Sequence, residues 1–181
     1  MHITIAVSGF QQEVWSKSFF PDDLPEDWRF DYYANEFRAI FLDKSDRHRL
    51  GSLVFEQILS EANAGFTFAL EVDGDQNADF GLVYDTKSTV LMLEFGPTKV
   101  VVSMTDIFIE QAVIVHQQNN CESACVLRVS SNRVPNNEEI KRLLVFINAH
   151  YGNFDRVYVF FAHGFMAVKV LNAARVINEL L

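Results

Sequence analysis

Both ends of this sequence pair a short apolar strand with an amphipathic helix, and this pattern constrains the fold more than any other feature. Near the N-terminus, residues 3–7 (ITIAV) form a short apolar run, and Pro25 opens a helix with acidic residues in its first turn. Near the C-terminus, residues 157–161 (VYVFF) read as a strand, and residues 165–180 carry an apolar stripe at helical spacing. Parallel strands joined by crossover helices produce such a pattern. The sequence therefore predicts an α/β fold with a mainly parallel sheet.

The middle of the chain departs from this alternation because it is rich in β-forming residues. Segments 82–84, 90–95 and 99–103 read as strands with turn residues between them, which predicts a hairpin or a meander. Residues 107–115 fit either a helix or a strand. The other expected elements are a strand over 37–42, a charged loop over 43–49, a helix from Leu50 that stops near Gly65, a strand over 66–72, a strand over 124–129, and a helix that Pro135 opens and Gly152 follows.

Size and composition predict a single acidic domain over residues 1–181. A hydrophobic fraction of 49% is enough for a core without a metal or disulfide bonds. The net charge of −9 disfavours nucleic acid and anionic membrane surfaces as partners, and no apolar run has the length of a membrane span. The two cysteines make no secreted disulfide framework, and the first ten residues lack the basic region of a signal peptide. We therefore expect a cytoplasmic protein.

The segment from Phe19 to Phe37 (FFPDDLPEDWRFDYYANEF), together with the strand after it, resembles the YecE-like family, known also as domain of unknown function seventy-two. The matching residues are Gly9, Trp15, Phe20-Pro21, Leu24-Pro25, Trp28, Tyr32-Tyr33 and Phe37. Looser matches follow in the third strand, in VLMLEFGP (90–97), in Leu127-Arg128-Val129, and in the final strand and helix. The resemblance implies a closed parallel barrel in which sites lie at the carboxyl ends of the strands.

Compared with that family, this chain is short and lacks most of the polar residues expected at the site. The shortfall falls between Pro97 and Cys125, so we expect a shortened or incomplete TIM-barrel-like architecture. Strand edges that are left open must be covered or paired, and pairing between two copies predicts a homodimer. The changed positions are Phe41-Leu42-Asp43 for a Glu-Ile-Asn, Glu71 for a Lys, Glu94 for a Gln, Ser130-Ser131 for a His-Gly, and Ala162-His163 for an Asn pair.

Five charged or titratable residues remain at the ends of the predicted strands. They are Asp43, Glu71, Glu94, Arg128 and His163. If the barrel forms, these side chains can converge on a small anionic or sugar-like ligand; otherwise they are unrelated surface charges. The loss of polar residues favours a non-catalytic ligand- or protein-binding protein. The alternative is a hydrolase or lyase that uses Glu71 or Glu94 with Arg128 and His163.

The sequence predicts neither a metal nor an organic cofactor. His116, Cys121 and Cys125 lie close together, but they lack the Cys-x2-Cys spacing and the fourth ligand of zinc sites. Cys125 also opens an apolar strand, where a buried thiol packs as a small hydrophobic side chain. The chain contains no phosphate-binding loop and no dinucleotide fingerprint.

Overall fold

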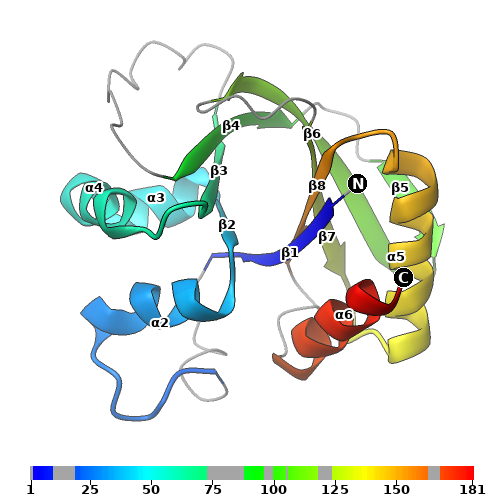
Figure 1. Cartoon of the computed structure of the whole chain (residues 1–181), viewed down its shortest axis with the longest axis horizontal. Coiled ribbons are helices and arrows are strands. Elements are labelled where there is room, and N and C mark those ends of the chain that lie inside the picture. Colours follow the sequence, from blue (N-terminus) through cyan, green and yellow to red (C-terminus); the bar gives the residue numbers. More distant parts are fainter. Residues whose placement is uncertain are drawn as a thin grey trace.

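The computed structural model has one curled β-sheet with helices packed on its outer face (Figure 1). It describes residues 2–9, 19–72, 88–95, 100–104, 106–117, 124–162 and 168–181. The elements, in chain order, are β1 (His2–Ser8), η1 (Glu26–Trp28), α2 (Arg29–Glu36), β2 (Ala39–Leu42), α3 (Lys44–Leu50), α4 (Ser52–Glu61), β3 (Thr67–Glu71), β4 (Thr89–Phe95), β5 (Val100–Met104), β6 (Ile107–Gln117), β7 (Ala124–Ser131), α5 (Asn137–Tyr151), β8 (Arg156–Phe161) and α6 (Val168–Leu180).

The parallel part of the sheet has the strand order β4-β3-β2-β1-β8-β7. These strands are rich in Val, Ile, Leu and Phe, and most of their residues are buried, as expected of parallel strands that are covered on both faces. The predicted α/β class with a mainly parallel sheet is therefore confirmed. The predicted strand over 82–84 lies outside the described residues.

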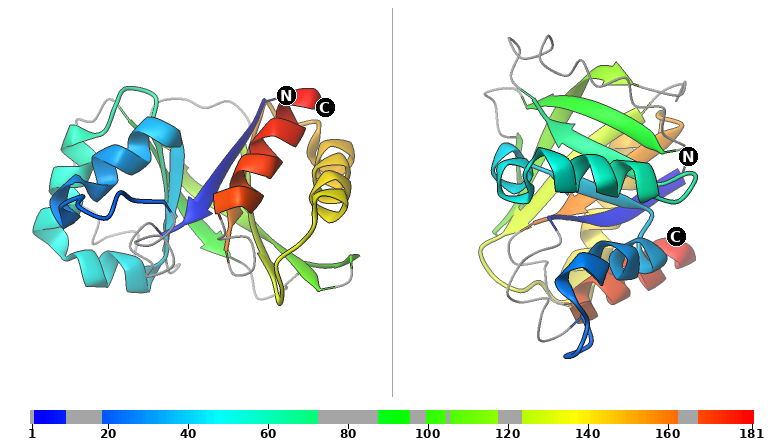
Figure 2. Two further views of the ribbon diagram at one scale, coloured as in Figure 1. Left: turned by 90° about the horizontal axis from the view of Figure 1, so that it is seen from below. Right: turned by 90° about the vertical axis from the view of Figure 1, so that its left-hand side faces the viewer.

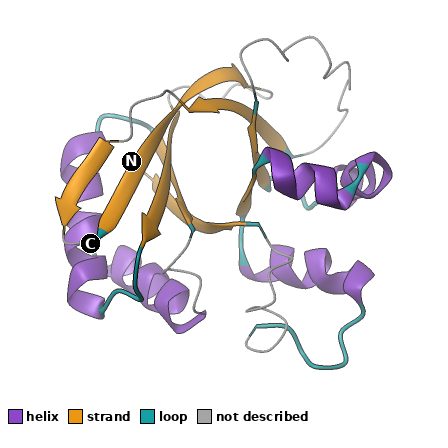
Figure 3. Cartoon of the chain, turned by 180° about the vertical axis from the view of Figure 1, so that it is seen from behind, coloured by secondary structure: helices purple, strands orange, loops and turns teal. Residues whose placement is uncertain are grey.

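Strand β6 brings the two ends of this parallel sheet together. It pairs antiparallel with β7, with Ile109 opposite Val129, and also with β4, with Glu94 opposite Val113. The sheet thus closes on itself, and Figures 1 and 3 show its strands curving round a common centre. Strands are confirmed over 90–95 and 99–103, as β4 and β5, but within the described residues they do not pair with each other: β5 pairs antiparallel with β6, and β4 pairs with β3 and β6. Residues 107–115, which fit either a helix or a strand, form part of strand β6, because β6 pairs with β7 on one side and β4 on the other.

Two groups of apolar side chains lie on opposite faces of the sheet. The larger group joins the sheet to the helices, with α2 and α4 on one side of the molecule and α5 and α6 on the other (Figure 2). The smaller group contains no helix residue, so it fills the interior of the closed sheet. There, small side chains from β1, β2 and β3 leave room for three aromatic rings of the same cluster. The alanines are Ala6, Ala39 and Ala69, and the rings are those of Phe41, Tyr158 and Phe160.

The charged loop predicted over 43–49 is wrong, because residues 44–50 form helix α3. Asp43 caps this helix, and its side chain accepts a hydrogen bond of 2.7 Å from the backbone N–H of Asp46. The helix buries only Leu50, so its sequence has no apolar stripe to reveal it. Among the described helices, none is both long enough and apolar enough to cross a membrane.

Candidate functional site

Arg128 lies on the inner face of the sheet, towards the carboxyl end of β7. Its partner in β8 is Phe160, a member of the interior cluster, so the two residues share a face. The guanidinium carbon of Arg128 lies 5.4 Å from the centroid of the Phe41 ring, and that ring lies 5.8 Å from the ring of Phe160. A cation over an aromatic face is attracted by the negative charge density of the ring. The aromatic interior therefore supports a positive charge at the end of the barrel where the parallel strands finish.

Two carboxylates lie where β2 runs into α3. Asp43 is the first residue after β2, and Asp46 follows in the first turn of the helix. The Asp46 side chain is only 15% exposed and forms an ion pair of 3.0 Å with Arg49. Burial raises the pKa of Asp46, the charge of Asp43 raises it further, and Arg49 and Arg128 oppose the change. Asp46 and Arg128 are thus close enough to interact electrostatically.

The end of β1 completes this corner of the structure. Gly9 has a φ of +76°, and its N–H donates a hydrogen bond of 2.8 Å to the carbonyl of Phe41. A β-carbon at Gly9 would lie 3.1 Å from Oδ2 of Asp46, so the carboxylate packs closely against the glycine backbone. We call Phe41, Asp43, Asp46 and Arg128 the carboxyl-rim cluster.

The predicted residue Glu71 lies at the end of β3 and is half-buried. Its carbonyl oxygen accepts a hydrogen bond from the guanidinium of Arg47, which ties α3 to β3. Glu94 belongs to β4, but the strand register places Leu93, and not Glu94, opposite Glu71. The side chain of Glu94 and the whole of His163 lie outside the described part of the chain.

Asp46 and Arg47 were missed by the sequence analysis because both fell within the predicted loop. The available signal was the spacing of Asp43 and Asp46, which matches a helix cap followed by an acid in the first turn. Chemically, the carboxyl-rim cluster offers a cation that can bind an anion and a carboxyl group whose raised pKa favours holding a proton.

Of the three residues His116, Cys121 and Cys125, the structure describes the side chain of Cys125. Cys125 is buried in the outer core, where burial raises the pKa of its thiol to about 11. No group of three or more His, Cys, Asp or Glu side chains suited to a metal occurs among the residues that the structure describes. Cys121 and the side chain of His116 lie outside that part of the chain.

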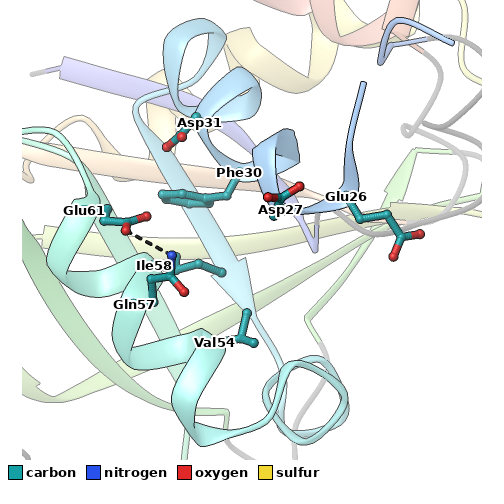
Figure 4. Close-up of a pocket in the computed structure, with 8 residues that line it drawn as sticks. All are labelled: Glu26, Asp27, Phe30, Asp31, Val54, Gln57, Ile58 and Glu61. Atoms are coloured by element: carbon teal, nitrogen blue, oxygen red, sulfur yellow. Dashed lines mark hydrogen bonds between the residues drawn. The ribbon is translucent and has the colours of Figure 1, made fainter. Parts of the chain in front are cut away.

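Two concave regions lie away from the carboxyl rim. One, of about 370 Å³, opens at the amino ends of the strands, where the Thr67 hydroxyl donates to the Tyr158 hydroxyl at 3.4 Å. The other, of about 270 Å³, lies between α2 and α4 and combines an apolar floor with acidic side chains (Figure 4). These two regions thus differ in charge and in polarity.

Comparison with known proteins supports the fold. The structure is similar to the crystal structure of a DUF72 family protein from Thermotoga maritima, with a TM-score of 0.64, 13% sequence identity and coverage of 99% of each chain. DUF72 is the family that the sequence was found to resemble, so that resemblance is confirmed at the level of the fold. No protein-family model matches the chain. The search of curated proteins also gave no match.

Proposed function

We propose that this protein is a non-catalytic binding protein that takes a small anionic ligand at the carboxyl-rim cluster. The observation that carries the proposal is the placement of the Arg128 guanidinium over Phe41, on the inner face and towards the carboxyl end of the sheet. Arginine presents a planar set of donors that matches the oxygens of a carboxylate or a phosphate. In parallel α/β barrels, ligands bind at this end of the strands.

The neighbouring carboxylates support binding over catalysis because each has a structural partner. Asp43 caps α3, and Asp46 pairs with Arg49. Below them, the inner face of the sheet carries fully buried apolar side chains such as Leu93 and Phe160. An enzyme needs a nucleophile or a proton-transfer group within reach of its substrate. Asp43 instead stabilises helix α3 as its cap.

The test is calorimetric titration with inorganic phosphate and citrate as probes, on the wild type, Arg128→Ala and Arg175→Ala. Arg175 is the matched control, since its guanidinium lies 5.5 Å from the Phe37 ring and also pairs with Glu36 at 3.7 Å. We expect Arg128→Ala to weaken binding of at least one probe tenfold or more, and Arg175→Ala to leave it unchanged. The proposal fails if both variants bind like the wild type.

A purely structural role for Arg128 gives a different result. In that case the positive charge of Arg128 stabilises the partly buried Asp46 carboxylate, as its lowering effect on the pKa of Asp46 indicates. Replacing Arg128 by Ala then removes this stabilisation, and the melting temperature falls. Melting curves at neutral pH, without added anion, separate the two roles. We expect a change of only a few degrees in Arg128→Ala alongside a clear loss of anion binding.

The second candidate is a hydrolase or lyase that acts on an anionic or sugar-like molecule. It would use Glu71 or Glu94 with Arg128 and His163. The observation in its favour is the raised pKa of Asp46, since a carboxyl group that keeps its proton more readily than a free aspartate is better suited to act as a general acid. A turnover screen with phosphate esters and uronic acids, followed by Asp46→Asn, tests it. Activity that Asp46→Asn leaves unchanged would remove Asp46 from the mechanism.

The proposal includes a single cytoplasmic domain over residues 1–181, built as a shortened relative of the TIM barrel and assembled as a homodimer. The antiparallel β6, which stands between β4 and β7, supports the shortened barrel. Strand β5 ends the strand order, and such an edge strand can pair with a second copy. Light scattering during gel filtration tests the dimer, and a monomer at micromolar concentration would contradict it.

A further inference from the structure

The groove between α2 and α4 has an apolar floor that belongs to the core. Phe30 and Ile58 line it and are 5% and 7% exposed, while Val54 at its edge is 46% exposed. The ring of Phe30 is held from behind by stacking on Phe68 at 5.9 Å. The floor is therefore a rigid apolar surface, and its cavity of about 270 Å³ is large enough for one long side chain of a partner.

Two further large apolar side chains are exposed on the segments that carry the lining residues. Trp28 adjoins the lining residue Asp27 in the sequence and is 62% exposed, and Leu53 adjoins Val54 and is 81% exposed. Exposed large apolar side chains are typical of an interaction surface for a macromolecule. A small molecule that filled the cavity would leave these two side chains in water. A segment of a protein partner would cover them.

The charge of the groove has one sign. Asp27, Asp31, Glu61 and Glu26 line it, and no basic residue does (Figure 4). In Figure 4 the first three surround the Phe30 ring, while the Glu26 carboxylate points away and pairs with Arg29 at 3.6 Å. Within the described residues, Asp27, Asp31 and Glu61 take part in no ion pair. A partner that brings positive charge would complement them.

Glu61 is placed where the helix itself disfavours a negative charge. It is the last residue of α4, whose final turn contains no basic residue, and its described hydrogen bond is the one from Gln57 at 3.0 Å. A carboxylate at a helix C-terminus interacts unfavourably with the helix dipole, and the acids across the groove add repulsion. A bound cation would relieve both effects.

We propose that this groove docks a basic amphipathic segment of a protein partner. An apolar side chain of that segment packs on Val54 at the edge of the groove. A Lys or Arg side chain enters the groove, lays its methylene stem over Phe30 and Ile58, and places its charged head among Asp27, Asp31 and Glu61. The groove lies outside the closed sheet, so this inference is independent of the carboxyl-rim cluster.

The test uses a fluorescein-labelled peptide of 15 Leu and Lys residues, arranged so that a helix has Leu on one face and Lys on the other. Binding is measured by fluorescence anisotropy on the wild type, on Asp31→Asn with Glu61→Gln, and on the control pair Glu138→Gln with Glu179→Gln. Both double variants remove two carboxylates, and the control carboxylates lie on the exposed surfaces of α5 and α6. We expect at least tenfold weaker binding for the groove variant and less than twofold for the control.

Three further measurements separate docking from general charge attraction. A Lys/Ser peptide of the same charge should bind at least tenfold more weakly, and Val54→Ser should weaken binding of the Leu/Lys peptide without changing net charge. Arg128→Ala should bind the peptide like the wild type. The inference is overturned if the Leu/Lys peptide does not bind, if both double variants lose affinity equally, or if the Lys/Ser peptide binds as tightly. Displacement of the Leu/Lys peptide by equimolar spermidine would also overturn it, in favour of a small cation.

Discussion

At the scale of single residues, the carboxyl rim depends on a few groups at junctions between strands and helices. Gly9 ends β1 in a left-handed conformation, Asp43 caps α3, and Asp46 packs between Gly9 and Arg49. Each of these residues lies where a strand ends or where a strand leads into a helix, and this position determines its contacts. Small changes at these positions should therefore be measurable as stability differences.

Replacing Gly9 by Ala should cost more than replacing Gly65 by Ala. Both glycines have a positive φ, +76° and +84°, which costs an alanine about 1 kcal/mol or more. The new β-carbon at Gly9 would also lie 3.1 Å from Asp46, whereas nothing lies within 4 Å of one at Gly65. Urea denaturation should give a larger loss for Gly9→Ala. The additional loss of unfolding free energy caused by Gly9→Ala should shrink when Asp46 is also replaced by Ala. If that loss stays the same, the contact between the new β-carbon and Asp46 is unimportant.

Replacing Asp46 by Asn should raise stability at neutral pH. Burial raises the pKa of Asp46 in the folded protein, so the folded state binds this proton more tightly than the unfolded state does. The stabilisation that comes from this bound proton is fully present below the pKa of Asp46 in the unfolded chain, about 4. It is lost as the pH rises through the pKa of Asp46 in the folded protein. The melting temperature of Asp46→Asn should exceed that of the wild type at pH 7, and the difference should disappear near pH 3. A lower melting temperature at pH 7 would mean that the Arg49 pair outweighs the cost of burial.

At the scale of elements, the sequence predicted the regular strands and helices because hydrophobic periodicity defines them. Helix α5 illustrates this, since its predicted face, Ile140, Leu143, Leu144 and Ile147, is fully buried. Helix α3 escaped prediction because one buried leucine gives no periodicity. Strand β6 was ambiguous because IFIEQAVIVHQ suits both periods, and pairing with distant strands decides its conformation.

The candidate site was predicted less completely than the fold, also for physical reasons. Asp43, Glu71 and Arg128 could be placed near strand ends because each follows or ends an apolar run. The contribution of Asp46 depends on α3 folding back beside Gly9, a long-range contact that no local pattern records. Predicting the acidic groove would have required knowing that α2 and α4 lie side by side.

The link between α2 and β2 gives a test at this scale. Tyr33 is fully buried, and its hydroxyl donates a hydrogen bond of 2.6 Å to the carbonyl of Ala39. Burial raises the pKa of this hydroxyl far above its ordinary value, so it remains a donor throughout the accessible pH range. Tyr33→Phe should cost about 1–3 kcal/mol in urea denaturation. Tyr151→Phe, at a half-buried position on α5, is the control and should cost less.

At the scale of the whole molecule, a closed and mainly parallel sheet surrounds an apolar interior and has a guanidinium at its carboxyl end. The chain carries a net charge of −9, so a cation held at the rim stands out against an acidic background. The acidic groove outside the sheet fits the opposite kind of partner. We propose an anion as the ligand of Arg128 at the rim and a basic partner for the groove, so the two proposed sites differ in the charge of what they bind.

Native mass spectrometry of the untagged protein tests the central claim, that the carboxyl rim binds a small anion through Arg128. The wild type, Arg128→Ala and Arg175→Ala would be purified alike and compared after addition of equal phosphate or citrate. We predict an added small-molecule mass on the wild type and on Arg175→Ala, and none on Arg128→Ala. The same added mass on all three proteins, or no added mass on any of them, would contradict the claim.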